Sequence, residues 1–113
     1  MTALPSPDPK IVRFEAMVLR FPDRSPPRFS LARALHDNGQ LEAAVPHYQK
    51  AAELQPDLMM AWLHGAECLS ALGRFAEALP LAEHAKRLAI AQGHEGPLAD
   101  VTELLEDLED ELD

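Results

Sequence analysis

Residues 28–56, RFSLARALHDNGQLEAAVPHYQKAAELQP, are followed 34 positions later by a related stretch, WLHGAECLSALGRFAEALPLAEHAKRLAI, at residues 62–90. Six residues keep their places in both copies: Ala32, Leu35, Gly39, Ala44, Pro46 and Ala51 recur as Ala66, Leu69, Gly73, Ala78, Pro80 and Ala85. A fixed period of this length is typical of stacked repeats rather than of a single closed core. Such stacks usually offer an extended surface to another molecule.

Working outward from this repeat, the chain predicts six helices, because apolar residues recur at helical spacing between proline and glycine breaks. Asn38-Gly39 and Gly73 mark turns within each copy, and Ser25 is expected to cap the helix that Pro26 and Pro27 begin. Pro46 and Pro80 lie close enough to their helix starts to be tolerated. The expected helices are 10–21, 25–38, 41–54, 59–72, 75–91 and, after a break at residues 94–97, 97–113.

The composition is that of one globular domain, with 113 residues, 47% hydrophobic and only 5% aromatic. The net charge of −9 is concentrated in residues 98–113, which carry eight acids and no base, whereas residues 1–34 carry six Lys or Arg against three acids. This sign argues against nucleic acid as the main partner. No apolar run is long enough to span a membrane, and a single cysteine excludes an internal disulfide, so we expect a cytoplasmic protein.

These residues resemble the tetratricopeptide repeat (TPR) family, whose 34-residue pattern combines a tryptophan, a Leu-Gly pair, a tyrosine, small residues and a closing proline. Trp62, Ala66, Gly73, Ala78 and Ala85 match the pattern in the second copy. The first copy matches with Leu31-Ala32, Leu35, Gly39, Ala44, Tyr48, Ala51 and Pro56, and Phe14 to Pro22 matches the second half of a truncated earlier repeat. The chain departs from the pattern at Arg28, Gly65, Ala82 and Ile90, so the second pair is expected to pack less tightly or to lean on the terminal helix.

The resemblance implies an all-α, right-handed α-solenoid of antiparallel helix pairs with a C-terminal capping helix. After a disordered lead-in at residues 1–9, one domain would span residues 10–113. It would comprise a half repeat at 10–22, repeats at 25–56 and 59–92, and an acidic helix at 97–113. Small residues such as Ala32 and Ala66 are expected where two helices cross closely.

The resemblance also implies a concave groove lined by the first helix of each pair. Its expected lining is Phe29, Ser30, Arg33, His36, Asp37, Met60, Leu63, His64, Glu67 and Ser70. Some family members grip a chaperone's C-terminal carboxylate with Lys and Asn, but the matching positions here hold Phe29, Arg33 and His64. We therefore expect a peptide with hydrophobic anchors rather than a chaperone tail.

The acidic helix leaves three alternatives open. Its leucine stripe could cover the end of the last repeat, as solenoid ends require. It could instead be a ligand of this protein itself, folding over the groove or meeting the basic front of a second copy. Finally, it could be a docking tail for an external basic partner.

No pattern of catalytic or cofactor chemistry is present in the sequence, which contains no phosphate loop, metalloprotease motif or nucleophile elbow. His36 and His64 would approach each other across the groove, but a metal site needs more ligands than this pair. Cys68 is expected to be a buried, inert thiol. We therefore expect no enzyme, catalytic residue, metal or cofactor.

Together these observations predict a protein-interaction module, an adaptor or scaffold, that binds a protein or peptide segment in its groove. The alternative is a structural subunit that self-associates, as a homodimer or larger assembly, through its basic front and acidic C-terminal helix.

Overall fold

The computed structural model describes residues 8–113, and within them it is all-helical. The six helices are α1 (Pro9–Arg20), α2 (Ser25–Asp37), α3 (Leu41–Leu54), α4 (Met59–Ala71), α5 (Phe75–Gln92) and α6 (Glu95–Leu112). The all-α solenoid expected from the repeat is confirmed. Most of the expected lead-in, residues 1–7, lies outside the described residues, and Pro9 already begins α1.

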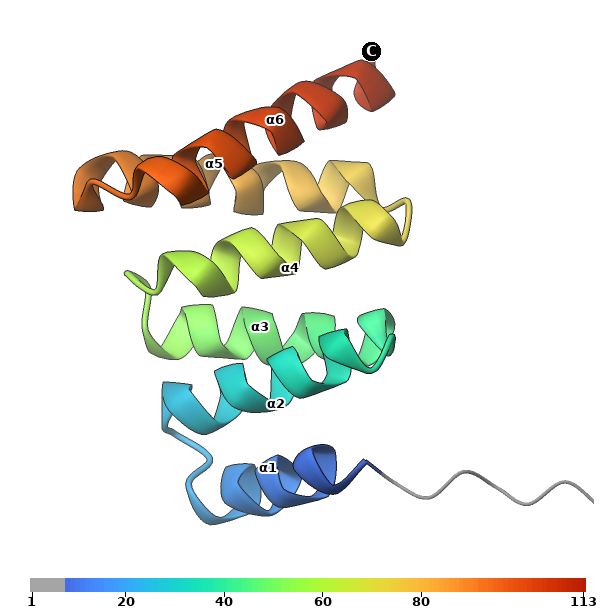
Figure 1. Ribbon diagram of the computed structural model, residues 1–113, viewed down its shortest axis with the longest axis vertical. Helices are drawn as coiled ribbons and strands as arrows, with labels where there is room; N and C mark the ends of the chain where they lie inside the picture. The colour runs from blue at the N-terminus through green and yellow to red at the C-terminus, as the bar shows by residue number, and fades with distance from the viewer. Residues whose placement is uncertain (1–7) are drawn as a thin grey trace, which may run out of the picture.

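The helices stack one after another along the long axis, with α1 and α6 at opposite ends (Figure 1). Each helix packs mainly on its neighbours in the chain, and α4 and α6 share a smaller contact. The stack measures 46 × 34 × 21 Å. Among the described residues, no helix combines the length and apolar character that a membrane span requires.

The turns within the two helix pairs have the same geometry, because both depend on a glycine in the left-handed conformation. Gly39 has φ 77° and Gly73 has φ 76°. After each glycine the next amide closes the turn: Gln40 N–H donates to Leu35 O at 2.9 Å, and Arg74 N–H to Leu69 O at 2.8 Å. The first helix of each pair therefore ends in the same way, 34 residues apart.

Small residues allow the helices to approach each other closely. Ala32, Ala44, Ala66 and Ala78 are fully buried, in agreement with the sequence-based expectation that they lie at helix crossings. The helices α3 and α5 run through Pro46 and Pro80, each five residues after its helix begins. These prolines are tolerated without ending the helix, as expected.

Two local expectations were wrong. Ser25 is the first residue of α2 rather than its cap, and its hydroxyl instead donates to Gln55 Oε1 at 2.6 Å, linking the start of α2 to the end of α3. The break expected at residues 94–97 is shorter, because α6 begins at Glu95 and includes Pro97 in its first turn. Proline is compatible with that turn, where backbone N–H groups have no partner within the helix.

The acidic helix α6 uses its apolar stripe against the rest of the stack. Val101, Leu105 and Leu108 are buried in the common core, whereas the acidic side chains are exposed. Its main contacts are with α5 and, to a smaller extent, α4. The helix therefore covers the end of the stack, which is the first of the three alternatives considered for it.

Candidate peptide-binding face

Side chains from α2 and α4 meet on one side of the stack and form the surface that we call the α2/α4 face. Phe29, Arg33 and His36 are spaced by four and three residues along α2, and Met60, His64 and Glu67 have the same spacing along α4. This spacing places each set on one side of its helix. Ser30, Asp37 and Ser70 flank the two sets.

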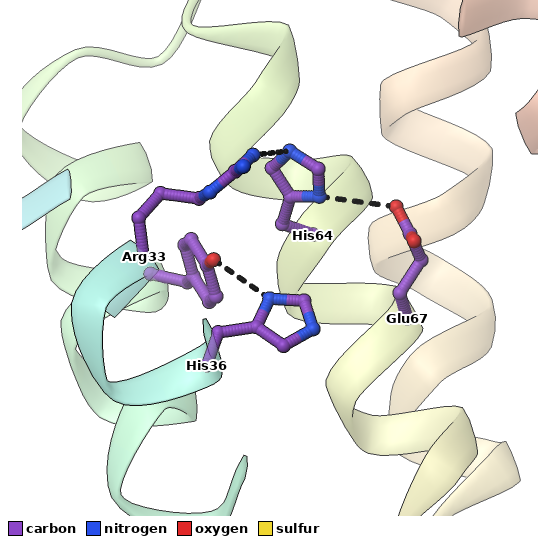
Figure 2. Close-up of polar contacts among 5 residues, drawn as sticks. Arg33, His36, His64 and Glu67 are labelled. Atoms are coloured by element: carbon purple, nitrogen blue, oxygen red, sulfur yellow. Dashed lines mark hydrogen bonds and ion pairs between the residues drawn. The ribbon is translucent and has the colours of Figure 1, made fainter. Parts of the chain in front are cut away.

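A chain of hydrogen bonds joins the two helices across this face (Figure 2). Arg33 Nη1 lies 2.8 Å from His64 Nε2, and His64 Nδ1 lies 3.1 Å from Glu67 Oε1. Because a guanidinium can only donate, His64 Nε2 must accept, and the imidazole proton therefore sits on Nδ1 and is donated to the carboxylate. This hydrogen bond orients the guanidinium of Arg33, which has further N–H groups beside the one that His64 accepts.

Aromatic rings pack beneath and beside this chain. Tyr48 from α3 is completely buried, and its ring centroid lies 5.8 Å from those of Phe29, His36 and His64. The Tyr48 hydroxyl lies 2.9 Å from His36 Nδ1. The ring centroids of His36 and His64 are 5.9 Å apart. The four rings form one packed cluster that spans both repeats.

Burial perturbs the titration of this cluster. Burial raises the pKa of Tyr48 well above its usual range, so its hydroxyl stays protonated. The pKa of His36 is lowered, chiefly by burial and next by the neighbouring His64. At neutral pH the cluster therefore holds a neutral His36 and a neutral Tyr48.

Most of the expected groove residues are at least partly accessible, but Leu63 is not. Its side chain is only 2% exposed and belongs to the hydrophobic core. The expectation that Leu63 lines the groove was wrong, because helical spacing gives the direction of a side chain but not its depth below neighbouring side chains. Tyr48, which sequence reasoning treated only as a repeat residue, forms the base of the face instead.

A pocket of about 310 Å³ adjoins the α2/α4 face at the junction of α1 and α2, and we call it the α1/α2 pocket. Its lining combines aromatic and charged side chains: Lys10, Arg13, Phe14, Phe29, Ser30, Arg33, Ala34 and Asp37. Four of these residues were expected in the groove. The contribution of α1 was not, although the basic character of this end of the chain was a signal for it.

The chain has a single cysteine, Cys68, and its thiol is buried. The buried Cys68 thiol has its pKa raised to about 11 by burial, which keeps it protonated at neutral pH. Within residues 8–113, no group of three or more His, Cys, Asp or Glu side chains is arranged to hold a metal ion.

A comparison with protein families matches residues 27–58 to the tetratricopeptide repeat. The chain contains a TPR unit. The match covers most of α2, all of α3 and the loop that follows. The ring cluster around Tyr48 therefore joins three rings of this unit to His64 of the next helix pair. No curated protein is a significant sequence match to the chain.

Solved TPR-like structures superpose on most of the chain. PcrH of Pseudomonas aeruginosa, in complex with the chaperone-binding region of PopD, has a TM-score of 0.85 at 25% identity over 91% of this chain and 78% of its own. The Yersinia enterocolitica translocator chaperone SycD has a TM-score of 0.83 at 23% identity, over 88% of this chain and 69% of its own. The TPR2B domain of yeast Sti1, in a complex with an Hsp70 peptide, has a TM-score of 0.79 at 19% identity, over 88% of this chain and 80% of its own. These likenesses show that the chain has the TPR fold.

Gly65, one of the departures from the TPR pattern, explains how the second unit packs. A Cβ atom at this position would lie 3.2 Å from Leu81 Cδ2 and 3.4 Å from Tyr48 Cβ. The missing side chain thus lets α4 approach both α3 and α5 closely. The sequence-based expectation was that the second pair packs less tightly or leans on the terminal helix; at Gly65 the contacts are close, and α4 does contact α6.

Proposed function

We propose that this chain is a protein-interaction module that binds an extended peptide or protein segment on the α2/α4 face. The observation that carries the proposal is the joined cluster of Arg33, His64 and Glu67 over the buried Tyr48 ring. The cluster presents hydrogen-bonding groups in fixed positions beside half-buried Phe29. A preorganised surface of this kind binds a ligand without ordering its own side chains first.

Structural neighbours support this proposal, since their names describe proteins bound to peptides or to segments of other proteins. PcrH was solved with the chaperone-binding region of PopD, SycD with a peptide of the translocator YopD, and the Sti1 domain with an Hsp70 peptide. By analogy this chain would act as an adaptor, scaffold or chaperone-like binder. The cytoplasmic location expected from its single cysteine stays a prediction.

On this proposal each group of the face has a separate task. Arg33 uses one N–H on His64, so its other N–H groups would bind a carboxylate or carbonyl of the segment. Phe29 and Met60 would contact its apolar side chains. Because the rings are already packed, we expect little backbone movement on binding.

The proposal is tested by selecting peptides from a displayed random library and measuring their affinity by fluorescence anisotropy. We expect Arg33→Glu and Met60→Glu each to weaken binding of the selected peptides by about tenfold. Arg87→Glu is the matched control, because Arg87 is also exposed and also contacts a histidine, His84, at 3.1 Å, but lies on α5. If no peptide is selected, or if the control weakens binding equally, the proposal is wrong.

A second function, self-association, is favoured by the surface of α1. Leu19 is 84% exposed, and Val12, Met17 and Phe21 are also exposed beside Arg20 and Arg24. The acidic α6 at the other end has the opposite charge, so copies would join through unlike ends and form chains rather than closed pairs. One neighbour, SycD, is described as an alternative dimer.

Sedimentation velocity over a range of protein concentrations tests this second function. Self-association through opposite charges predicts a mass that rises with concentration and falls as salt is added, because salt screens exposed charges. Leu19→Glu should abolish the increase. A monomer at every concentration in low salt would rule it out.

A further inference from the structure

We infer that the α1/α2 pocket binds an acidic peptide segment through one large apolar side chain flanked by carboxylates. The inference rests on the proposed function, because the pocket shares Phe29, Ser30 and Arg33 with the α2/α4 face. It adds the chemical class of the partner, and it adds a contribution from α1 that lies outside the TPR unit matched at residues 27–58.

The apolar part of the pocket is built by two helices. Phe14 comes from α1 and Phe29 from α2, both are partly buried, and Ala34 lies in the same lining. The volume of about 310 Å³ is at the lower end of the range of about 300–1,000 Å³ typical of ligand pockets. It therefore suits one side chain with its adjoining backbone better than a whole helix face.

The charged part of the pocket is cationic in a chain that is strongly acidic overall. Lys10, Arg13 and Arg33 line it together with a single acid, Asp37. Arg13 is held in place by its own neighbour, with its guanidinium carbon 5.0 Å from the centroid of the Phe14 ring. Arg33 is held by its hydrogen bond to His64.

Within residues 8–113 these three cations have no ion-pair partner, as is the case for most Lys and Arg side chains there; only Lys50 and Arg74 pair with a carboxylate. Arg74, for comparison, pairs with Glu77 at 2.6 Å and with Glu42 at 3.6 Å. The chain holds 19 acids for 10 Lys and Arg, so a pocket lined by three cations and one acid reverses the overall charge of the chain locally. Positioned guanidinium groups beside apolar rings match a ligand that carries carboxylates and an apolar anchor.

The test uses a labelled heptapeptide, Glu-Asp-Glu-Leu-Glu-Asp-Glu, with acetyl and amide ends, and the full-length protein. Two comparison peptides replace the leucine by alanine, or the acids by their amides. We expect binding of the first peptide, at least about tenfold weaker binding of both others, and a loss of affinity with added salt. Equal binding of the leucine-free peptide would overturn the inference, because it would reduce the pocket to nonspecific attraction of anions.

Two charge reversals on α1 locate the site. Arg13 and Arg20 are both exposed, and each guanidinium lies over the ring of the next residue, at 5.0 and 5.3 Å, but only Arg13 lines the pocket. Arg13→Glu should weaken binding of the heptapeptide by about tenfold, and Arg20→Glu should weaken it by less than about twofold. Equal losses from the two variants would place the peptide elsewhere and overturn the inference.

The inference and the proposed function can fail separately. Met60 lies on the α2/α4 face but outside the pocket. If library-selected peptides bind and are weakened by Met60→Glu while the acidic heptapeptide does not bind, the inference is wrong and the proposed function stands. If neither kind of peptide binds, both are wrong.

Discussion

Gly65 shows how a single missing side chain decides the approach of three helices. A leucine, which the TPR pattern favours at this position, would collide with Leu81 and Tyr48, so Gly65→Leu should lower the free energy of unfolding by about 1–3 kcal/mol. Gly65→Ala should be nearly neutral, since a gain in helix propensity of about 0.5–1 kcal/mol offsets the tight contact. Urea unfolding followed by circular dichroism measures both changes.

The matched control for this position is Gly96→Ala, because a Cβ there meets nothing within 4 Å and the residue also lies in a helix. It should leave stability unchanged or slightly raised. A Gly65→Leu variant as stable as the wild type would show that α4 is not held against its neighbours at this position.

His36 gives the cluster a predictable dependence on pH. Its pKa in the folded protein is lowered from 6.5, chiefly by burial and next by the neighbouring His64. The carboxylates of Glu67 and Asp37 raise this pKa, and the guanidinium of Arg33 lowers it further. The unfolded chain therefore takes up this proton first as the pH falls. The contribution of His36 to stability is complete above about pH 6.5 and is lost as the pH falls toward its folded pKa.

The variant that tests this dependence is His36→Gln, whose amide can still bond to the Tyr48 hydroxyl. We expect a smaller fall in melting temperature between pH 7.5 and 5.5 than in the wild type. Some fall should persist, because the pKa of His47 is also lowered, by burial and by Arg28. His94→Gln, at an exposed position between α5 and α6, serves as the control. An unchanged pH dependence in His36→Gln would contradict the prediction.

At the level of elements, α6 stabilises the stack through its buried stripe and not through its charges. Leu108 is fully buried, so Leu108→Ala should lower the free energy of unfolding by about 2–5 kcal/mol. Leu112, in the same helix, is 44% exposed, and Leu112→Ala should cost less than about 0.5 kcal/mol. Chemical unfolding of both variants checks the difference. Equal effects would mean that α6 does not cover the end of the stack.

The boundaries of the helices could be predicted closely because the signals are local. Gly39, Gly73, Pro22 and Pro56 each end an element through their own backbone preferences. The structure differs from the expected start of α6 at residue 97: the helix begins at Glu95 because a first helical turn accepts proline, so Pro97 does not break the chain.

The candidate site could be predicted only in part, for a different reason. The repeat resemblance put side chains of α2 and α4 on one shared side and predicted that His36 and His64 approach each other, and their ring centroids lie 5.9 Å apart. It could not give the depth of Leu63, which depends on neighbours from other helices. Nor could it place Lys10 and Arg13 beside Phe29, because that contact depends on the angle at which α1 meets α2.

For the whole molecule, the decisive property is that nearly all contacts join neighbours in the stack. The helix α1 is covered mainly by α2 alone, whereas α3 and α4 have a helix on each side. In such a linear arrangement the ends open at a lower free energy than the middle.

Native-state hydrogen exchange read out by mass spectrometry should therefore show a gradient of protection. Amides of α3 and α4 should exchange slowest, amides of α1 fastest, and those of α6 in between, because α6 buries Val101, Leu105 and Leu108 against its neighbours. Leu108→Ala should speed exchange in α6 and α5 while leaving α2 nearly unchanged, since coupling passes only between adjacent helices. Equal exchange in every helix would instead show that the stack unfolds as one cooperative unit, in which α6 at one end stabilises the α2/α4 face.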